Sequence, residues 1–199
     1  GPRPLVAYSL MAYESCRDVR QIVLVVRRNR IEAAKSMALM FGISKLRAVV
    51  AGGTKRQDSV RKGLEALPPE TRYVSIHDAA RPLVTPELIS ETIKSAQKYG
   101  SGVAGRRMVD TVKLVEKTTV VSRTIDRSQL WTVQTPQTFQ LELIQKAYEH
   151  LAETGADVTD DAAALEEIGE TVRLVEWPHA NLKVTVPEDL TVAASLLRI

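Results

Sequence analysis

Two hydrophobic periods alternate along the chain. In some segments apolar residues recur every three or four positions, which is the spacing of one helix face. Other segments are short runs of branched apolar residues, which are typical of strands buried on both faces. Helices are expected over residues 4–15, 31–41, 58–67, 85–96, 141–151, 160–168 and from Pro187 onward; strands are expected over residues 22–26, 46–50, 73–76, 131–135, 172–175 and 182–184. This alternation predicts an α/β fold with right-handed crossovers and a mostly parallel sheet.

The regular alternation stops after Gly102. Two β-branched runs, residues 109–115 and 119–125, flank a three-residue polar segment, which is the pattern of an antiparallel hairpin. A two-stranded ribbon is only marginally stable alone. This arm, about residues 109–131, is therefore expected to pack against something, and a second subunit is a reasonable candidate.

Composition narrows the class of protein. A chain of 199 residues that is 44% hydrophobic and 26% charged can bury one sizeable core, which favours a single domain over residues 1–199. No apolar run approaches the ~20 residues that span a bilayer, and the single cysteine, Cys16, allows no internal disulfide. The expected location is therefore the cytoplasm. The net charge of +3 suits an anionic small ligand, while scattered basic residues and 5% aromatics argue against nucleic acid.

Asp78 and Arg81 follow the strand expected over residues 73–76. Pro82 cannot donate to a strand ladder, so both charges should lie beyond the strand's carboxyl end, where open α/β sheets bind ligands. A carboxylate there can hold a cation or a ribose hydroxyl, and a guanidinium can grip a phosphate. An ordinary Asp–Arg pair that fixes a turn explains the same residues, and local sequence leaves both interpretations open.

Three further segments carry weaker signals. Gly52-Gly53 precedes a helix whose first turn carries Ser59; the glycines would let a ligand approach the backbone, or would simply form a tight turn. Thr159 is the expected N-cap of a helix, and two acids follow it, so capping alone would explain these residues. Lys183 interrupts an apolar strand, where it either faces solvent or neutralises charge near a phosphate.

Six ordered segments resemble the 2-C-methyl-D-erythritol 4-phosphate cytidylyltransferases of isoprenoid biosynthesis over nearly the whole chain. They are His77-Asp78-Ala79-Ala80-Arg81-Pro82, Val109-Asp110-Thr111-Val112-Lys113, Thr124-Ile125-Asp126-Arg127, Thr135-Pro136-Gln137, Val158-Thr159-Asp160-Asp161-Ala162 and Lys183-Val184-Thr185-Val186-Pro187-Glu188-Asp189-Leu190. Six motifs in order are far more specific than any one of them. The resemblance implies a Rossmann-like nucleotidyltransferase fold, a homodimer joined through the arm, and Mg²⁺-dependent transfer of CMP from CTP to the sugar phosphate.

Residue by residue, the resemblance implies two sides of a site. The nucleotide side comprises positions around the cytosine base, which are Gly52, Gly53 and Ser59. It also comprises positions near the ribose and the metal, which are Asp78 and Ala79. The pocket for the sugar phosphate would be lined by Arg81, Thr135 and Thr159. The arm residues that reach across the dimer to the substrate phosphate would be Thr111 and Arg127. The residue that positions the attacking phosphate and offsets its charge would be Lys183, which together with Arg127 would be catalytic.

Two features depart from the family. The family's first strand, which lies in the sheet interior, and the Gly-rich loop that follows it and grips the triphosphate with an Arg and a Lys have no counterpart from Gly1 onward. Residues upstream of Gly1 are therefore expected, and these 199 residues alone should be poor catalysts. Gly105-Arg106-Arg107-Met108 stands where the family usually runs small and apolar into a proline, which leaves the strand path at the root of the arm open.

Two alternatives to the methylerythritol phosphate enzyme remain. A ribitol 5-phosphate cytidylyltransferase resembles the chain in nearly all these motifs and would differ in its sugar pocket. A non-catalytic dimer of the same fold would bind CTP only weakly.

Overall fold

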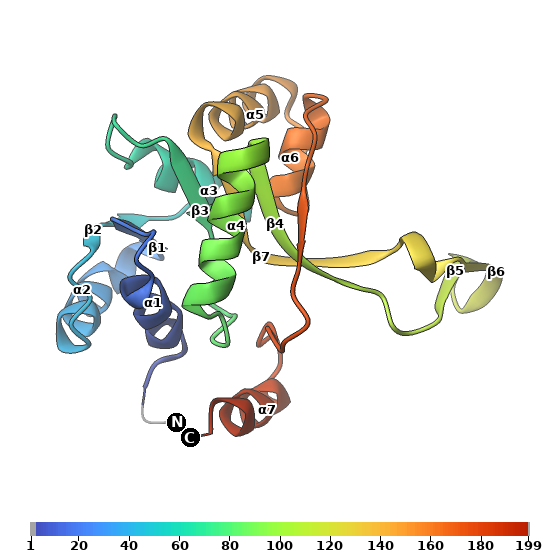
Figure 1. Cartoon of the computed structure of the whole chain (residues 1–199), viewed down its shortest axis with the longest axis horizontal. Coiled ribbons are helices and arrows are strands. Elements are labelled where there is room, and N and C mark those ends of the chain that lie inside the picture. Colours follow the sequence, from blue (N-terminus) through green and yellow to red (C-terminus); the bar gives the residue numbers. More distant parts are fainter. Residues whose placement is uncertain (1–2, 199) are drawn as a thin grey trace.

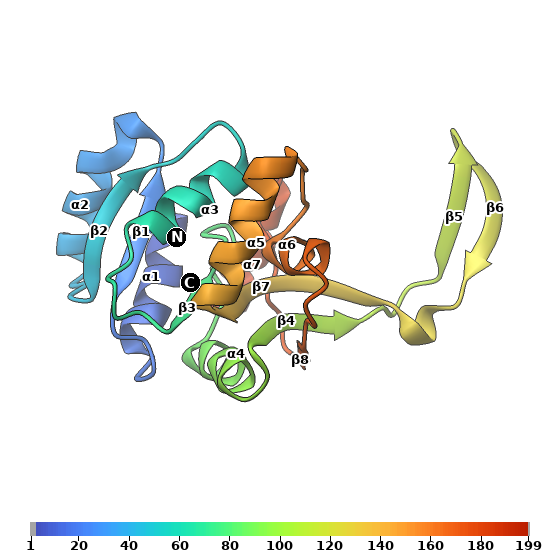
Figure 2. The same cartoon turned by 90° about the horizontal axis from the view of Figure 1, so that it is seen from above.

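The structure is a computed structural model that describes residues 3–198 (Figures 1 and 2), so Gly1 and Pro2 lie outside the described residues. The α-helices are α1 (Leu5–Ser15), α2 (Ile31–Met40), α3 (Arg56–Glu65), α4 (Pro86–Tyr99), α5 (Leu141–Thr154), α6 (Asp161–Glu167) and α7 (Pro187–Leu197). The strands are β1 (Ile22–Val26), β2 (Leu46–Ala51), β3 (Tyr73–Ile76), β4 (Ser101–Arg107), β5 (Val112–Lys117), β6 (Val120–Ile125), β7 (Trp131–Gln140) and β8 (Leu174–Glu176). Every expected helix is present. Within residues 3–198, no helix is both long enough and apolar enough to cross a membrane.

The strands of the body form two sheets. β1 and β2 pair in parallel, with Leu24 opposite Val49. The second sheet has the order β3-β7-β4-β8. β7 is antiparallel to both β3 and β4, whereas β8 is parallel to β4. Only β7 therefore runs against its sheet, and the expected α/β fold with mostly parallel strands is confirmed.

β4 is a strand that the hydrophobic pattern does not predict. Its residues from Ser101 to Gly105 are small and buried. A Cβ atom on Gly102 would lie 2.2 Å from the backbone oxygen of Thr92 on α4. The close approach of α4 therefore requires small residues here. Because small residues lack the β-branched pattern of a strand, the sequence does not predict β4.

β7 continues through Pro136, where the sequence predicts a stop. The Thr135–Pro136 peptide is cis, and the register with β4 shifts between Val103 and Gly105, opposite this proline. Proline lacks the N–H that a ladder needs and is tolerated at such an irregularity. The prediction that the strand ends at residue 135 is therefore wrong.

Residues 182–184 form no strand, which corrects a second expectation. The Val184 N–H donates to the Ala80 carbonyl oxygen at 2.8 Å, which fixes this segment beside the turn after β3. Lys183 therefore reaches the region of β3 from an irregular segment.

Helices cover both faces of the sheets (Figure 2). One core cluster joins β1 to α1, α2 and α4, and the other joins β7 to α3, α5 and α6. The neighbouring residues Val103 and Ala104 of β4 are both fully buried, one in each cluster. Successive residues of a strand point to opposite faces, so β4 connects the two halves of the core.

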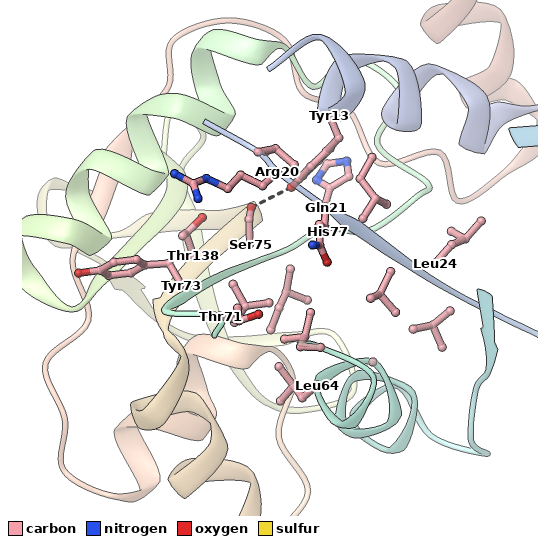
Figure 3. Close-up of a pocket in the computed structure, with 18 of the residues that line it drawn as sticks. Tyr13, Arg20, Gln21, Leu24, Leu64, Thr71, Tyr73, Ser75, His77 and Thr138 are labelled. Atoms are coloured by element: carbon pink, nitrogen blue, oxygen red, sulfur yellow. Dashed lines mark hydrogen bonds between the residues drawn. The ribbon is translucent and has the colours of Figure 1, made fainter. Parts of the chain in front are cut away.

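A cleft of about 1160 Å³ separates β1 from β3 (Figure 3). Each of these strands pairs along one edge only within residues 3–198, and its other edge lies at the cleft. Ile22 and Leu24 of β1 are buried, but Val23 and Val25 are only half-buried and line the cleft. The expectation that β1 is buried on both faces is therefore met on one face only.

The arm stands well away from the body (Figures 1 and 2). β5 and β6 pair antiparallel, and Thr118 turns the chain between them with φ of 52°. The predicted hairpin is confirmed. Large apolar side chains on the arm are exposed: Val109, Leu114, Val115, Val120 and Val121.

The root of the arm has a defined path. Arg106 and Arg107 are the last residues of β4. The Arg107 guanidinium lies 4.7 Å from the ring centroid of Trp131, and its Nε lies 3.3 Å from a carboxylate oxygen of Glu176. The two arginines thus extend β4 toward the arm.

Candidate active site

Charged side chains of both signs meet beyond the carboxyl end of β3. One carboxylate oxygen of Asp78, Oδ2, lies 2.9 Å from Lys183 Nζ, and the other, Oδ1, lies 3.3 Å from Arg56 Nε. The Asp78 side chain is 18% exposed. Both of its oxygens are therefore paired with a cation in a largely desolvated place.

The pKa of Asp78 lies below its ordinary value. Burial opposes ionisation, but the hydrogen bond from Lys183 and the charge of Arg56 outweigh burial and lower the pKa. Asp78 is consequently ionised at neutral pH and holds two cations together.

Arg56 connects this group to a second carboxylate, on α6. Its Nη1 and Nη2 lie 3.1 and 2.7 Å from the two carboxylate oxygens of Asp161, and the Tyr148 hydroxyl donates to the same carboxylate at 2.6 Å. Asp161 is fully buried. Burial alone would lower the pKa of Arg56, but the hydrogen bond and the charge of Asp161 raise it above its ordinary value. Burial and the Asp161 charge likewise raise the pKa of Tyr148, so its hydroxyl keeps its proton and donates.

We expect Asp161→Asn to lower the free energy of unfolding by about 2 kcal/mol. Removing one partner of a buried ion pair leaves the other charge uncompensated, at a cost of about 3–5 kcal/mol, and the part-exposed Arg56 regains some hydration. Urea unfolding at pH 7 measures the change. The matched control is Asp157→Asn, because Asp157 pairs with Lys55 on the surface, where solvent screens the pair, and its loss should change the free energy of unfolding much less. Equal effects of the two substitutions would contradict this account.

Thr135 and Arg81 adjoin Asp78 from two directions. The buried Thr135 Oγ1 accepts the backbone N–H of Asp78 at 3.0 Å. The Arg81 Nη1 donates to the carbonyl oxygen of Asn181 at 2.8 Å. The Arg81 Nε is buried without a hydrogen-bond partner in the described part of the chain. Arg81 thus has a donor that its own fold leaves unused.

The expected nucleotide residues come together along the cleft. Ser59, Asp78 and Ala79 line it, and Ser59 also lines a neighbouring cavity of about 450 Å³ together with Gly52 and Gly53. A Cβ on Gly52 would lie 2.7 Å from Ser59 Oγ, and one on Gly53 would lie 2.2 Å from the Asp58 Cβ. The close approach of α3 is by itself enough to require both glycines, so a base-binding role stays a prediction.

Thr159 is exposed and directly precedes the start of α6. The prediction that it caps this helix is wrong, because the Asp160 side chain accepts the Ala163 N–H at 2.9 Å. The ion pair between Arg56 and Asp161 holds the start of α6 beside the Asp78 group. The hydroxyl of Thr159 is therefore free of the capping role that sequence assigns to it.

Thr111 and Arg127 do not join this group. Both belong to the arm, which projects away from β3 (Figure 1). Arg127 is exposed, and its Nη1 donates to the carbonyl oxygen of Val109 within the same arm. Within one chain, these two residues lie apart from Asp78, Arg81 and Lys183.

Sequence reasoning missed Arg56, Asp161 and Asn181. Arg56 is the first residue of α3, where the helix dipole disfavours a positive charge. A residue that breaks a local rule in this way often serves a site, and this signal could have identified it. Asp161 carried no comparable signal, because an acid in the first turn of a helix is what local rules predict.

The side chains of this site could supply only a minority of the ligands of a magnesium ion. No group of three or more His, Cys, Asp or Glu side chains that could hold a metal occurs in residues 3–198. Mg²⁺ usually binds one or two carboxylates and completes its shell with water and substrate phosphates. Asp78 can serve as such a single carboxylate, and its partner Lys183 has 43% of its side chain exposed.

Comparison with known proteins places this geometry in a family. A model of the family described as IspD, 2-C-methyl-D-erythritol 4-phosphate cytidylyltransferase, matches residues 1–199. A protein of that name from Alkaliphilus oremlandii is 40% identical over 197 residues, which cover 98% of this chain and 84% of that protein. One from Desulforamulus reducens is 42% identical with the same coverage.

Solved structures agree. The crystal structure of 4-diphosphocytidyl-2C-methyl-D-erythritol synthase from Anaerococcus prevotii has a TM-score of 0.92 at 30% identity, covering 100% of this chain and 88% of that one. The 2-C-methyl-D-erythritol 4-phosphate cytidylyltransferase of Thermus thermophilus has a TM-score of 0.85 at 29% identity, covering 100% and 91%.

Proposed function

This chain belongs to the 2-C-methyl-D-erythritol 4-phosphate cytidylyltransferase family, and we propose that the side chains around Asp78 carry that family's reaction. The protein is a nucleotidyltransferase that transfers CMP from CTP to 2-C-methyl-D-erythritol 4-phosphate, giving 4-diphosphocytidyl-2-C-methyl-D-erythritol and pyrophosphate. We place the reaction in the cytoplasm. The observation that supports the site is the convergence of Asp78, Lys183 and Arg81 at one end of β3.

In this proposal a phosphate oxygen of the acceptor attacks the α-phosphorus of CTP in line. The new oxygen–phosphorus bond forms as the bond to the pyrophosphate leaving group breaks, and no covalent enzyme intermediate is needed. Catalysis then consists of positioning and charge neutralisation. Lys183, with 43% of its side chain exposed beside Asp78, offsets the charge of the attacking phosphate. Arg81, Thr135 and Thr159 would line the sugar-phosphate pocket, where the Arg81 guanidinium would grip the phosphate.

Magnesium belongs to the proposal as a bound cofactor. Asp78 is the carboxylate that would hold it, with the remaining ligands coming from the triphosphate and water. When bound, Mg²⁺ supplies positive charge to the phosphates of CTP. Ala79 follows Asp78 and is exposed, so its backbone leaves room for the ribose. Gly52, Gly53 and Ser59 would surround the base.

The arm supports a homodimer. Its exposed apolar residues include Val109 at 65% and Val120 at 69%, and a two-stranded ribbon has no core of its own to cover them. In a twofold dimer the arm of one subunit packs on the other subunit. Thr111 and Arg127 would then reach the acceptor phosphate in the partner's site.

The acceptor decides between the related functions. With the full-length protein, CTP and Mg²⁺, we expect pyrophosphate release with 2-C-methyl-D-erythritol 4-phosphate and none with ribitol 5-phosphate. Release with ribitol 5-phosphate alone would replace the assignment with the ribitol enzyme. Release with neither acceptor, together with weak CTP binding by calorimetry, would indicate a non-catalytic dimer.

A further inference from the structure

We propose that His77 is a positioning residue, which fixes from behind the turn that presents Asp78 and Arg81. The inference rests on the proposed function of these two residues. His77 directly follows β3, and its half-buried ring lies beside Tyr13 of α1, with 5.6 Å between the ring centroids (Figure 3). It therefore lies behind the turn, where it contacts backbone and hydroxyl groups of the site.

The partners of the imidazole determine which nitrogen carries hydrogen. Nε2 lies 3.2 Å from the carbonyl oxygen of Arg81. A carbonyl oxygen only accepts, so Nε2 is the protonated nitrogen and donates. Both ring nitrogens face neutral partners, the Arg81 carbonyl and the Thr135 hydroxyl, so we infer a neutral ring whose Nδ1 carries a lone pair.

The remaining hydrogens then have one consistent arrangement. Thr135 Oγ1 lies 3.0 Å from His77 Nδ1 and donates its single hydrogen to that lone pair. The same oxygen accepts the Asp78 backbone N–H at 3.0 Å. A directed chain therefore runs from the Asp78 N–H through Thr135 to His77, and from His77 to the Arg81 carbonyl.

These hydrogen bonds hold both ends of one turn, from Asp78 to Arg81. The Arg81 N–H donates to the Asp78 carbonyl oxygen at 2.9 Å, which closes the turn from within. The imidazole joins the N–H of the first residue, through Thr135, to the carbonyl of the last. A rigid neutral imidazole supplies the two groups that this arrangement uses, a donor at Nε2 and an acceptor at Nδ1. The Asp78 and Arg81 side chains are thus presented from a backbone whose two ends are fixed.

Three substitutions of His77 test its two hydrogen bonds separately. His77→Phe keeps a ring but removes both hydrogen bonds, and we expect it to lower kcat/KM for the acceptor about 10- to 30-fold. His77→Asn retains an acceptor that can reach Thr135, and His77→Gln retains a donor that can reach the Arg81 carbonyl. Each of these two should recover part of the loss. The control is His150→Gln on α5, which should leave turnover unchanged.

The ring itself gives a readout that does not depend on turnover. Long-range ¹H–¹⁵N spectra of the full-length protein should show the His77 ring protonated at Nε2 only at pH 7. A ring protonated at Nδ1, or His77→Phe turnover within threefold of wild type, would overturn the proposal. Wild-type protein that turns over no sugar phosphate would instead contradict the proposed function, and the spectrum would still decide the tautomer.

Discussion

Asp78→Asn is expected to lower the rate of CMP transfer about a thousandfold. The substitution removes the only charge that pairs with both Arg56 and Lys183 in this group, while it keeps the size of the side chain. Removing one preorganised electrostatic contact usually costs about 10²–10³ in rate, and here both Arg56 and Lys183 lose their common partner. Steady-state pyrophosphate release measures the effect.

The control and the pH profile sharpen this test. Asp157→Asn removes a surface carboxylate and should leave the rate within about twofold of wild type. Because the pKa of Asp78 is held below its ordinary 3.8, Asp78 stays ionised as the pH falls to that value. Its protonation therefore should not produce a loss of wild-type activity between pH 7 and pH 5. Full activity of Asp78→Asn would remove Asp78 from the site.

Arg127→Ala should lower kcat/KM for the sugar phosphate about a hundredfold and leave the KM for CTP nearly unchanged. A guanidinium that grips a phosphate contributes a strong charge-assisted contact, and Arg127 is proposed to contact the acceptor only. The matched control is Arg123→Ala, because Arg123 is an equally exposed arginine on β6 of the same arm. Initial rates at varied acceptor and at varied CTP separate the two constants.

Mixing experiments show whether Arg127 acts across a dimer. Asp78→Asn and Arg127→Ala subunits are each defective, but a mixed dimer has one site with both native residues. Random exchange of equal amounts should restore about a quarter of wild-type activity. No recovery, in a mixture whose mixed dimers are verified by mass spectrometry, would place Arg127 in the site of its own chain or outside any site.

Local sequence rules predict the helices from their apolar faces, and α4 also carries its own start and stop signals. In α4, the N-cap Thr85 accepts the Leu88 N–H with its side chain, Pro86 is the first helical residue, and Gly100 with φ of 85° is the C-cap. The strands are less predictable, because their extent depends on packing and pairing with neighbouring elements. β4 has small residues because α4 packs closely against it. β7 continues through Pro136 because its register with β4 is irregular at that position.

The residues of the site likewise divide into those that the sequence predicts and those that only tertiary contacts reveal. Asp78, Arg81 and Lys183 could be selected from the ordered motifs, and the structure brings them to one place. The contact between Arg56 and Asp161 joins residues 105 positions apart, and neither has a periodicity that reports the other. Thr111 and Arg127 stay predictions, since their proposed neighbours belong to a second subunit.

The cleft between β1 and β3 makes the stability of this protein depend on what fills it. Gly52 directly follows β2 and Asp78 lies after β3, so a nucleotide that contacts both would join the β1–β2 sheet to the rest of the molecule. Within residues 3–198 alone, the edges of β1 and β3 at the cleft are unpaired, so the β1–β2 sheet should open locally at a smaller free-energy cost than the four-stranded sheet, and its amides should exchange with solvent sooner. Ligand binding adds stability as RT ln(1 + [L]/Kd), so occupancy of the cleft and cohesion of the fold rise together.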